Sequence, residues 1–326
     1  MGGMFSRMWD QSFFLPKPTF TEDELPDQTG KVHIITGGYT GIGFELAKML
    51  YSRNSTVYLA GRSPSKGSAA INTLNTEFPD SKGRVEFLHL DLADLSTIKA
   101  SATSFLAKET RLDVLINNAG VMIPPKDSKT AQGYDLQTGT NVYGPFLFTT
   151  LLLPILQRTA QTAEKGSVRV CWASSIGGEV FAPKGGVAFG SDGLLDSAMS
   201  NEKLYGQSKA ASILLGAEAA YRWGKDGIIS NSFHPGNLQS ELQRHASAVQ
   251  RALFGFMLHP VKFGAYTELF AGWSPEVTGE RNGGQSETGP VLDLYLIGQK
   301  NAQESRLILG EAHWNRSTSA SAFPAL

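Results

Sequence analysis

The most constraining feature of this sequence is an apolar, β-branched run that ends in a glycine-rich turn and continues into a helical pattern. The run covers residues 31–36, the turn carries Gly37, Gly41 and Gly43, and helical apolar spacing follows over 42–50. This order predicts a strand, a tight turn and a helix. Glycines let a backbone approach a phosphate, and a helix N-terminus offers N–H donors. The spacing differs from the commoner Gly-x-Gly-x-x-Gly, and alone it could be a simple connection.

Strand and helix patterns alternate along most of the chain. Further strands are predicted at 56–60, 84–90, 112–116, 167–173 and 228–233, with a short last one at 291–296. Helices are predicted at 95–106 and 145–156. The alternation predicts the α/β class: a single doubly wound parallel sheet (a Rossmann fold) of about seven strands, with helices on both faces. We expect an N-terminal extension (1–29), one catalytic domain (30–300) and a polar C-terminal tail (301–326).

Composition excludes several classes of partner. Lys and Arg number 29 against 30 Asp and Glu, a net charge of −1, so nothing favours nucleic acid or an anionic membrane. No stretch of 18 apolar residues occurs, so we expect no integral membrane segment. Cys171 is the only cysteine, which suits a reducing, cytoplasmic location. No paired His, Cys or carboxylate spacing indicates a metal site.

Two aromatic stretches have open interpretations. Five aromatic residues lie within the first 20 positions and either dock on the domain or lie on a membrane surface; little positive charge accompanies them, which favours docking. The stretch 237–273 is also rich in aromatic residues, and it is either part of the core or a lid over an apolar substrate.

Polar residues follow the predicted strands where ligands bind in open parallel sheets. Arg62 follows the second strand, where an acidic residue would hold a ribose 2′-hydroxyl and an arginine accommodates a 2′-phosphate. Arg62 therefore favours NADP(H), with Lys66 near enough to help, unless it is only a solvated loop charge. Asn117 to Gly120 follow the fourth strand and fit either close passage of a cofactor or a simple asparagine turn.

Tyr205 and Lys209 stand four positions apart at the start of an apolar run. In a helix this spacing places the phenol and the ammonium on one face, and a nearby ammonium favours the phenolate. The pair is therefore a candidate proton donor, although the same spacing occurs on many solvated helix faces. Ser174 and Ser175 follow the fifth strand, and a long glycine-rich stretch, predicted to be a loop, separates them from Tyr205.

Taken together, these motifs resemble the short-chain dehydrogenase/reductase superfamily over residues 30 to 300. The motifs in order are Thr36-Gly37-x-x-x-Gly41-Ile42-Gly43, Asp91-Leu92, Asn117-Asn118-Ala119-Gly120, Asn141, Ser175 with Tyr205-x-x-x-Lys209, and Pro235-Gly236. The resemblance implies that Tyr205 exchanges a proton with the substrate oxygen and that Ser175 hydrogen-bonds to that oxygen. It also implies that Lys209 binds the nicotinamide ribose and lowers the Tyr205 pKa, while Asn141 holds a water that links Lys209 to solvent.

The resemblance also implies a set of residues that line NADP(H). They are Gly37, Gly41, Ile42, Gly43, Arg62, Lys66, Asp91, Leu92, Asn118, Ala119, Gly120, Tyr205, Lys209, Pro235 and Gly236. Two features depart from the common pattern: the spacing from Ser175 to Tyr205 is longer, and the usual Thr after Pro-Gly is missing, with Ser240 as a substitute. The longer spacing, Arg62 and the His-Pro-Gly run look similar to retinol-dehydrogenase-like and fungal secondary-metabolite reductases.

The implied function is an NADP(H)-dependent oxidoreductase that interconverts an alcohol and a carbonyl on a bulky apolar small molecule. Two alternatives remain: the same fold acting as an enone reductase or isomerase, and a non-catalytic NADP(H)-binding scaffold. A homodimer or tetramer would pair the helix after Asn141 with the helix that bears Tyr205, where small residues permit close approach. Packing within one chain would need those small residues too.

Overall fold

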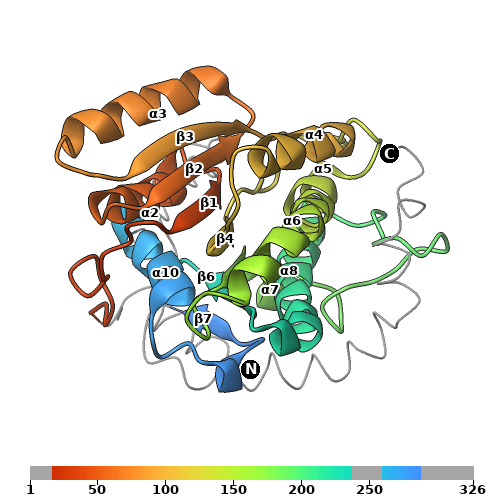
Figure 1. The fold of residues 1–326 in the computed structure, drawn as a ribbon. Coiled ribbons are helices and arrows are strands. Elements are labelled where there is room, and N and C mark those ends of the chain that lie inside the picture. The colour runs from red at the N-terminus through yellow and green to blue at the C-terminus, as the bar shows by residue number, and fades with distance from the viewer. Residues whose placement is uncertain (1–16, 237–258, 288–326) are drawn as a thin grey trace.

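The computed structural model describes residues 17–236 and 259–287, which build one parallel sheet flanked by helices (Figure 1). The sheet has seven strands in the order β3-β2-β1-β4-β5-β6-β7. The strands are β1 (Val32–Thr36), β2 (Thr56–Gly61), β3 (Arg84–His89), β4 (Val114–Asn117), β5 (Arg169–Ala173), β6 (Ile229–His234) and β7 (Gln285–Glu287). Every pairing is parallel, and the strand order reverses direction between β1 and β4. The predicted doubly wound fold is confirmed.

Burial explains which sequences form the central strands. Every residue of β1, β4, β5 and β6 is buried, as expected for strands covered on both faces. The sequences of β1, β4 and β5 are mostly apolar, whereas β6 also buries two serines, an asparagine and a histidine. The edge strand β3 is more exposed and carries charges at Arg84 and Glu86. Arg84 pairs with Glu86 and with Glu109, which places a charged row on the edge and discourages pairing with another chain.

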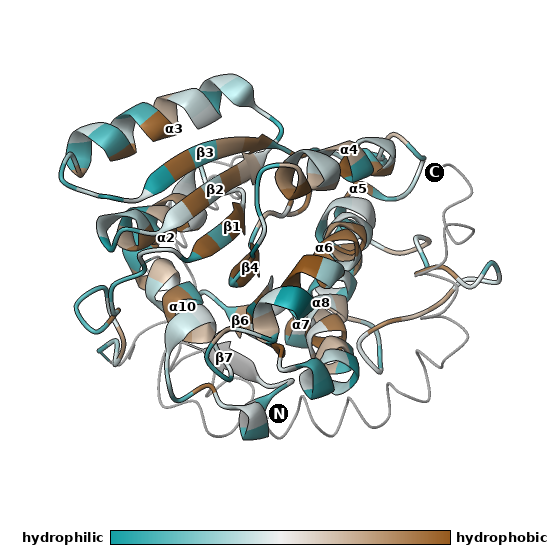
Figure 2. Ribbon diagram, viewed as in Figure 1, coloured by the Kyte–Doolittle hydropathy of each residue, from teal (hydrophilic) through white to brown (hydrophobic). Residues whose placement is uncertain are grey.

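Helices cover both faces of the sheet and enclose two apolar cores (Figure 2). The helices are α2 (Gly41–Ser52), α3 (Pro64–Glu77), α4 (Leu95–Leu106), α5 (Leu136–Thr138), α6 (Gly144–Ala160), α7 (Gly177–Val180), α8 (Asn201–Trp223) and α10 (Val261–Trp273). Residues of α4, α6 and α8 share one core with the sheet, and residues of α2, α3 and α10 share the other. Helix α3 had no explicit prediction, although Ser63 and Pro64 form a typical helix start.

The structure describes part of each aromatic stretch and shows where that part packs. Ala265, Leu269 and Ala271 of α10 lie in the core beside α2, so this half of 237–273 is core and not lid. Residues 237–258 lie outside the described residues, as does the strand expected at 291–296; the seventh strand that the structure describes is β7. Phe20 and Leu25 also pack into that core, so the described end of the N-terminal segment docks on the domain.

The small residues of α8 are used within the chain. A Cβ on Gly216 would lie 3.3 Å from the Asn231 backbone and from the Trp172 ring, and one on Gly178 would lie 3.0 Å from the Ala210 backbone nitrogen. These contacts indicate that the small residues permit close packing within one chain. Among the described residues, one stretch, Leu136–Ala160, is long and apolar enough to cross a membrane, but 67% of its most apolar window is buried inside this domain, as in a core helix.

Candidate active site

The predicted glycine turn joins β1 to α2 in a conformation that depends on glycine. Gly37 and Gly41 have positive φ angles of 69° and 58°. A Cβ on Gly43 would lie 2.7 Å from Asn118 Nδ2 and 3.0 Å from the Gly37 carbonyl oxygen, too close for either. The turn therefore leaves open backbone at the start of a helix, where a phosphate group fits.

The end of β4 is hydrogen-bonded to the same turn. Asn118 donates from Nδ2 to the Thr36 carbonyl oxygen at 2.9 Å, and the Ala119 N–H donates to Thr36 Oγ1 at 2.9 Å. Asn118 and Ala119 thus lie beside Gly37, and Gly120 lies beside Asn141 and Lys209. The asparagine is more than a local turn residue, because its amide joins two strands that are far apart in the sequence.

Arg62 and Lys66 lie together at the carboxyl end of β2. Both side chains are exposed, and Lys66 stands in the first turn of α3. Ser63 caps that helix by accepting a hydrogen bond from the Lys66 N–H at 3.4 Å. Two cations at a helix N-terminus make this corner suited to an anionic group. Tyr39, which the sequence analysis did not single out, packs against Gly61 next to Arg62.

Asp91 and Leu92 follow β3 on the other side of the turn. Asp91 Oδ1 accepts a hydrogen bond from the Ala93 N–H at 2.9 Å and so fixes the local chain. Leu92 is buried, and a Cβ on Gly144 would lie 2.6 Å from its carbonyl oxygen. This close approach packs the start of α6 against the carboxyl edge of the sheet.

Tyr205 lies in the second turn of α8 and is 7% exposed. It packs against α7, since a Cβ on Gly177 would lie 2.8 Å from Tyr205 Cε1 and 3.5 Å from Ser175 Oγ. Burial raises the pKa of the phenol, while a hydrogen bond from the Ser175 side chain lowers it. The lowering of this pKa by Lys209, which the resemblance implied, stays a prediction.

Lys209 lies one helical turn after Tyr205 and is also buried. Its Nζ donates to the Ala173 carbonyl oxygen at 3.0 Å and lies 6.0 Å from the centre of the Tyr205 ring. Burial lowers the pKa of the ammonium to about 8. A Cβ on Gly120 would lie 3.5 Å from Nζ and 3.1 Å from Asn141 Oδ1, so the backbone of Gly120 lies directly beside the lysine. The pair is a buried constellation and not a solvated helix face.

Asn141 lies in a π-helical turn, Gly139–Tyr143, directly before α6. Its Oδ1 accepts from the Val121 N–H at 2.8 Å, and its Nδ2 donates to the Val121 carbonyl oxygen at 2.9 Å and to Ser208 Oγ at 3.0 Å. The side-chain amide is therefore fully engaged in holding the Gly120–Val121 segment to α8. Single π turns inside helices are frequent at functional sites because they displace the regular backbone hydrogen bonds.

The long stretch between Ser175 and Tyr205 is partly ordered into α7 and packs on α8. Gln207 holds it by accepting from the Ala188 N–H at 2.8 Å and donating to the Asp196 carbonyl oxygen at 2.9 Å. The Leu195 N–H donates to the Tyr143 hydroxyl at 3.0 Å. The sequence analysis missed Gln207, Ser208 and Tyr143; polar residues inside an otherwise apolar helix were the available signal.

Pro235 and Gly236 follow β6 at the same edge, with Gly236 at φ 90°. The neighbouring Ser174 N–H donates to the Phe233 carbonyl oxygen at 2.7 Å, so the ends of β5 and β6 stay joined up to this turn. The structure thus brings the predicted residues of β1, β2, β4, β5, β6 and α8 to one edge of the sheet. Ser240 lies outside the described residues.

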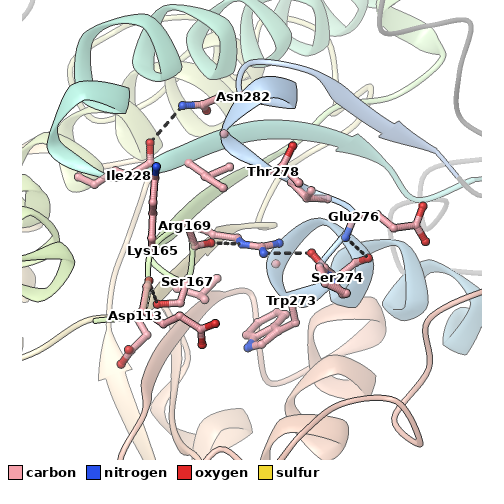
Figure 3. A pocket seen from close by; sticks show the side chains of 18 of the residues that line it. Asp113, Lys165, Ser167, Arg169, Ile228, Trp273, Ser274, Glu276, Thr278 and Asn282 are labelled. Carbon is pink, nitrogen blue, oxygen red and sulfur yellow. Dashed lines mark hydrogen bonds between the residues drawn. The ribbon is translucent and has the colours of Figure 1, made fainter. Parts of the chain in front are cut away.

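A second feature, a partly open cavity of about 2210 Å³, lies at the opposite edge (Figure 3). Its lining includes Asp113, Arg169 and Ile228, which stand at the amino ends of β4, β5 and β6. Arg169 is 6% exposed and donates to the backbone carbonyls of Gly166, Ala271 and Ser274 at 2.9, 3.3 and 3.0 Å. Its guanidinium therefore caps the carboxyl end of α10, so this edge has a structural role.

Comparison with known proteins places the chain among relatives of similar length. The family model "short chain dehydrogenase" matches residues 31–251. A short-chain dehydrogenase/reductase of Phomopsis amygdali is 46% identical over 296 residues, 89% of this chain and 88% of the relative. One from Emericella nidulans is 47% identical over 267 residues, 81% of this chain and 84% of the relative.

Solved structures show the same fold at lower identity. The Pseudomonas aeruginosa RhlG/NADP active-site complex has a TM-score of 0.61 at 22% identity and covers 79% of this chain and 94% of its own. An Escherichia coli CFT073 putative short chain dehydrogenase complexed with NADPH has a TM-score of 0.61 at 19% identity, covering 83% and 100%. With the fold, the buried Tyr205–Lys209 pair and these matches in agreement, the chain belongs to the short-chain dehydrogenase/reductase family of nicotinamide-dependent oxidoreductases.

Proposed function

We propose that this chain is an NADP(H)-dependent oxidoreductase that interconverts an alcohol and a carbonyl on a bulky apolar small molecule. The observation that carries the proposal is the buried Tyr205, with the Ser175 hydroxyl on its phenol and Lys209 one turn away. A phenol held out of water next to a hydroxyl donor is suited to exchange a proton with a substrate oxygen. The two alternatives, double-bond reduction and cofactor binding without turnover, remain outcomes of the tests below.

Each residue of the site has a distinct task in this proposal. Tyr205 gives its phenolic proton to the carbonyl oxygen in reduction and takes it back in oxidation, and Ser175 donates a hydrogen bond to the same oxygen. Bound NADP(H) would supply or accept the hydride. Lys209, fixed by Ala173, would hold the nicotinamide ribose.

Asn141 supports Lys209 in an indirect way. Its side-chain amide is engaged by Val121 and Ser208, so a water at this position would bind a main-chain carbonyl of the π turn and not the side chain. Asn141 would then align the helix end and the Gly120 segment around the lysine, and the water would connect Lys209 to solvent.

The choice of NADP(H) over NAD(H) is supported by the corner at the end of β2. Arg62 and Lys66 are exposed there beside the N-terminus of α3, and both can reach an anion. A ribose 2′-phosphate is such an anion, whereas a 2′-hydroxyl gains little from two cations. Asp91, Leu92 and the glycine turn complete the proposed adenosine side.

An apolar substrate is supported by the segment between Ser175 and α8. Val187, Phe189 and Leu195 pack in a small apolar cluster with α8, and Phe181 is 42% exposed just after α7. Apolar side chains beside a few polar groups are typical of small-molecule sites.

The free, buried Cys171 accords with a reducing compartment, and we propose the cytoplasm as the location.

The test of the catalytic role is Tyr205→Phe, which removes only the hydroxyl. We expect turnover of an apolar ketone with NADPH to fall at least tenfold, with NADPH affinity within about twofold of wild type. Product analysis with matched ketones and enones separates carbonyl reduction from double-bond reduction. More than a tenth of the wild-type rate in the variant would remove Tyr205 from the proton-transfer role, and binding without any turnover by the wild type would favour the scaffold alternative.

The test of cofactor choice is Arg62→Ala. Loss of a charged hydrogen-bond partner should weaken NADPH binding by roughly 1–3 kcal/mol and leave NADH binding nearly unchanged. Titration of the purified protein with each cofactor, followed by nicotinamide fluorescence, measures both. An equal loss for the two cofactors would assign Arg62 a structural role.

A further inference from the structure

The last residue of β6 is a buried histidine whose ring is tied to the turn that follows it. His234 is 3% exposed. Its Nδ1 accepts a hydrogen bond from the N–H of Gly236, two residues later, at 3.4 Å. Its other ring nitrogen, Nε2, is buried without a hydrogen-bond partner in the described part of the chain. The ring therefore makes one specific polar contact, and that contact is to the backbone of the Pro235–Gly236 turn.

The surroundings keep this imidazole neutral. Burial, and to a smaller extent the Lys209 ammonium, lower the pKa of His234 to about 4. Since Nδ1 accepts a hydrogen bond, the ring proton of the neutral form lies on Nε2. A neutral ring is required for the contact, because a protonated Nδ1 could not accept from the Gly236 N–H.

The turn itself needs an external support. Proline fixes its own φ and has no N–H to donate, and Gly236 adopts φ 90°, which other residues rarely reach. An acceptor on residue i that binds the N–H of residue i+2 closes such a turn, as asparagine and aspartate side chains do. His234 supplies this acceptor through Nδ1.

The position of the turn connects it to the site. Ala173, which holds Lys209 Nζ, pairs with Phe233 in the sheet, and His234 is the next residue of β6. The turn after His234 therefore begins directly beside the lysine. In the proposed function, the Pro235–Gly236 turn lies on the nicotinamide side of the cofactor, since the adenosine side lies across the sheet at the end of β2.

We propose that His234 is a positioning residue. Through Nδ1 it fixes the Pro235–Gly236 turn, and this turn determines where the nicotinamide end of the bound cofactor lies. The proposal rests on the proposed function for the identity of the ligand. The contribution is a single neutral hydrogen bond, so its loss corresponds to roughly 3- to 10-fold in affinity.

Asparagine and glutamine provide a matched pair of substitutions. His234→Asn keeps an acceptor at the distance of Nδ1, whereas His234→Gln carries the same amide one methylene farther out, and His234→Leu removes the acceptor. We measure the affinity of each for NADPH and for adenosine 2′,5′-bisphosphate, which lacks the nicotinamide. We expect the Leu and Gln variants to bind NADPH roughly 3- to 10-fold more weakly and the Asn variant to stay within about twofold. The bisphosphate affinity should be unchanged in all three.

Several results would overturn the assignment. They are wild-type NADPH affinity in the Leu variant, equal losses for NADPH and the bisphosphate, the same loss in the Asn and Gln variants, or no NADPH binding by the wild type. If the Leu and Gln variants do not fold, the imidazole nitrogen NMR spectrum of the wild type tests the hydrogen bond from the Gly236 N–H to Nδ1. A proton on Nδ1 at neutral pH would refute that hydrogen bond. A wild type that binds NADPH but reduces no carbonyl refutes the proposed reaction, while the affinities still decide the role of His234.

Discussion

Lys209 is retained at a cost in stability, and Lys209→Met should reveal that cost. Burial lowers the pKa of the lysine to about 8 from its ordinary value of 10.5. The unfolded chain therefore binds more protons than the folded protein between these two values, so this lysine destabilises the fold most below about pH 8 and progressively less as the pH rises toward 10.5. At pH 7 the shift corresponds to about 3 kcal/mol.

The variant also loses a favourable contact. Nζ donates to the Ala173 carbonyl oxygen at 3.0 Å, and leaving that carbonyl unpaired costs about 1–2 kcal/mol. Methionine has a similar length and no charge, so it should fill the space. We expect Lys209→Met to be more stable than wild type by about 1–2 kcal/mol at pH 7, and this gain to shrink by about 2 kcal/mol near pH 9.5.

Urea unfolding of the cofactor-free protein at the two pH values measures this difference. Lys99→Met is the control, since Lys99 is exposed on α4, and its effect should be small and the same at both pH values. A variant that is less stable than wild type at pH 7, with a difference that does not change with pH, would refute the reasoning that Lys209 is a desolvated cation.

Three further substitutions test separate parts of the structure. Arg169→Met removes the cap on α10 and leaves the Gly166 carbonyl without its side-chain donor, while the Ala271 and Ser274 carbonyls keep the Asn231 amide and the Val277 N–H; the unfolding free energy should therefore fall by on the order of 2 kcal/mol in urea unfolding. Gly43→Ala pushes a Cβ against Asn118 and should weaken NADPH binding by at least roughly tenfold in a fluorescence titration, whereas Gly279→Ala meets nothing within 4 Å and should not. Glu268→Met should raise stability by about 1–3 kcal/mol at pH 7, because both carboxyl oxygens are buried without a partner among the described residues and burial raises the pKa of this group; an unchanged melting temperature would contradict this.

Much of the fold could be predicted because central parallel strands have a strong sequence pattern. The first six strands appear within two or three residues of their predicted ends, and the helix predicted at 95–106 has those bounds in the structure. Apolar β-branched runs are selected by burial on both faces, and the helices between them are selected by one apolar face. The edge strand β7 has no such signal, being three residues long.

The site residues could be predicted by type and spacing, but their electrostatics could not. The spacing of Tyr205 and Lys209 suggested that the ammonium would lower the pKa of the phenol. In the structure the ammonium is held by Ala173, and burial raises the phenol pKa. Burial and competing hydrogen bonds depend on residues distant in sequence, so a motif cannot report them.

The same limit applies to residues that act through long-range contacts. Gln207 holds the segment before α8, and Ser208 bonds to Asn141 from a position 67 residues away in the chain. Both are variable positions of the Tyr-x-x-x-Lys pattern, so the pattern gives no reason to notice them. Only their burial in α8, between Tyr205 and Lys209, indicates that they have polar partners.

Residues at the two edges of the sheet contribute differently to stability and to the candidate site. At the amino edge, Arg169 and Asp113 satisfy backbone groups: Arg169 caps α10, and Asp113 accepts from the Val32 N–H at 2.9 Å. At the carboxyl edge, Lys209, His234 and the glycine turn are buried or conformationally restricted in ways that cost free energy. The desolvated Lys209 ammonium and an imidazole nitrogen without a partner among the described residues thus lie at the edge that carries the candidate site, where they cost stability. It follows that substitutions at the amino edge should change stability while leaving cofactor choice intact, whereas those at the carboxyl edge should change binding or turnover and can even stabilise the fold.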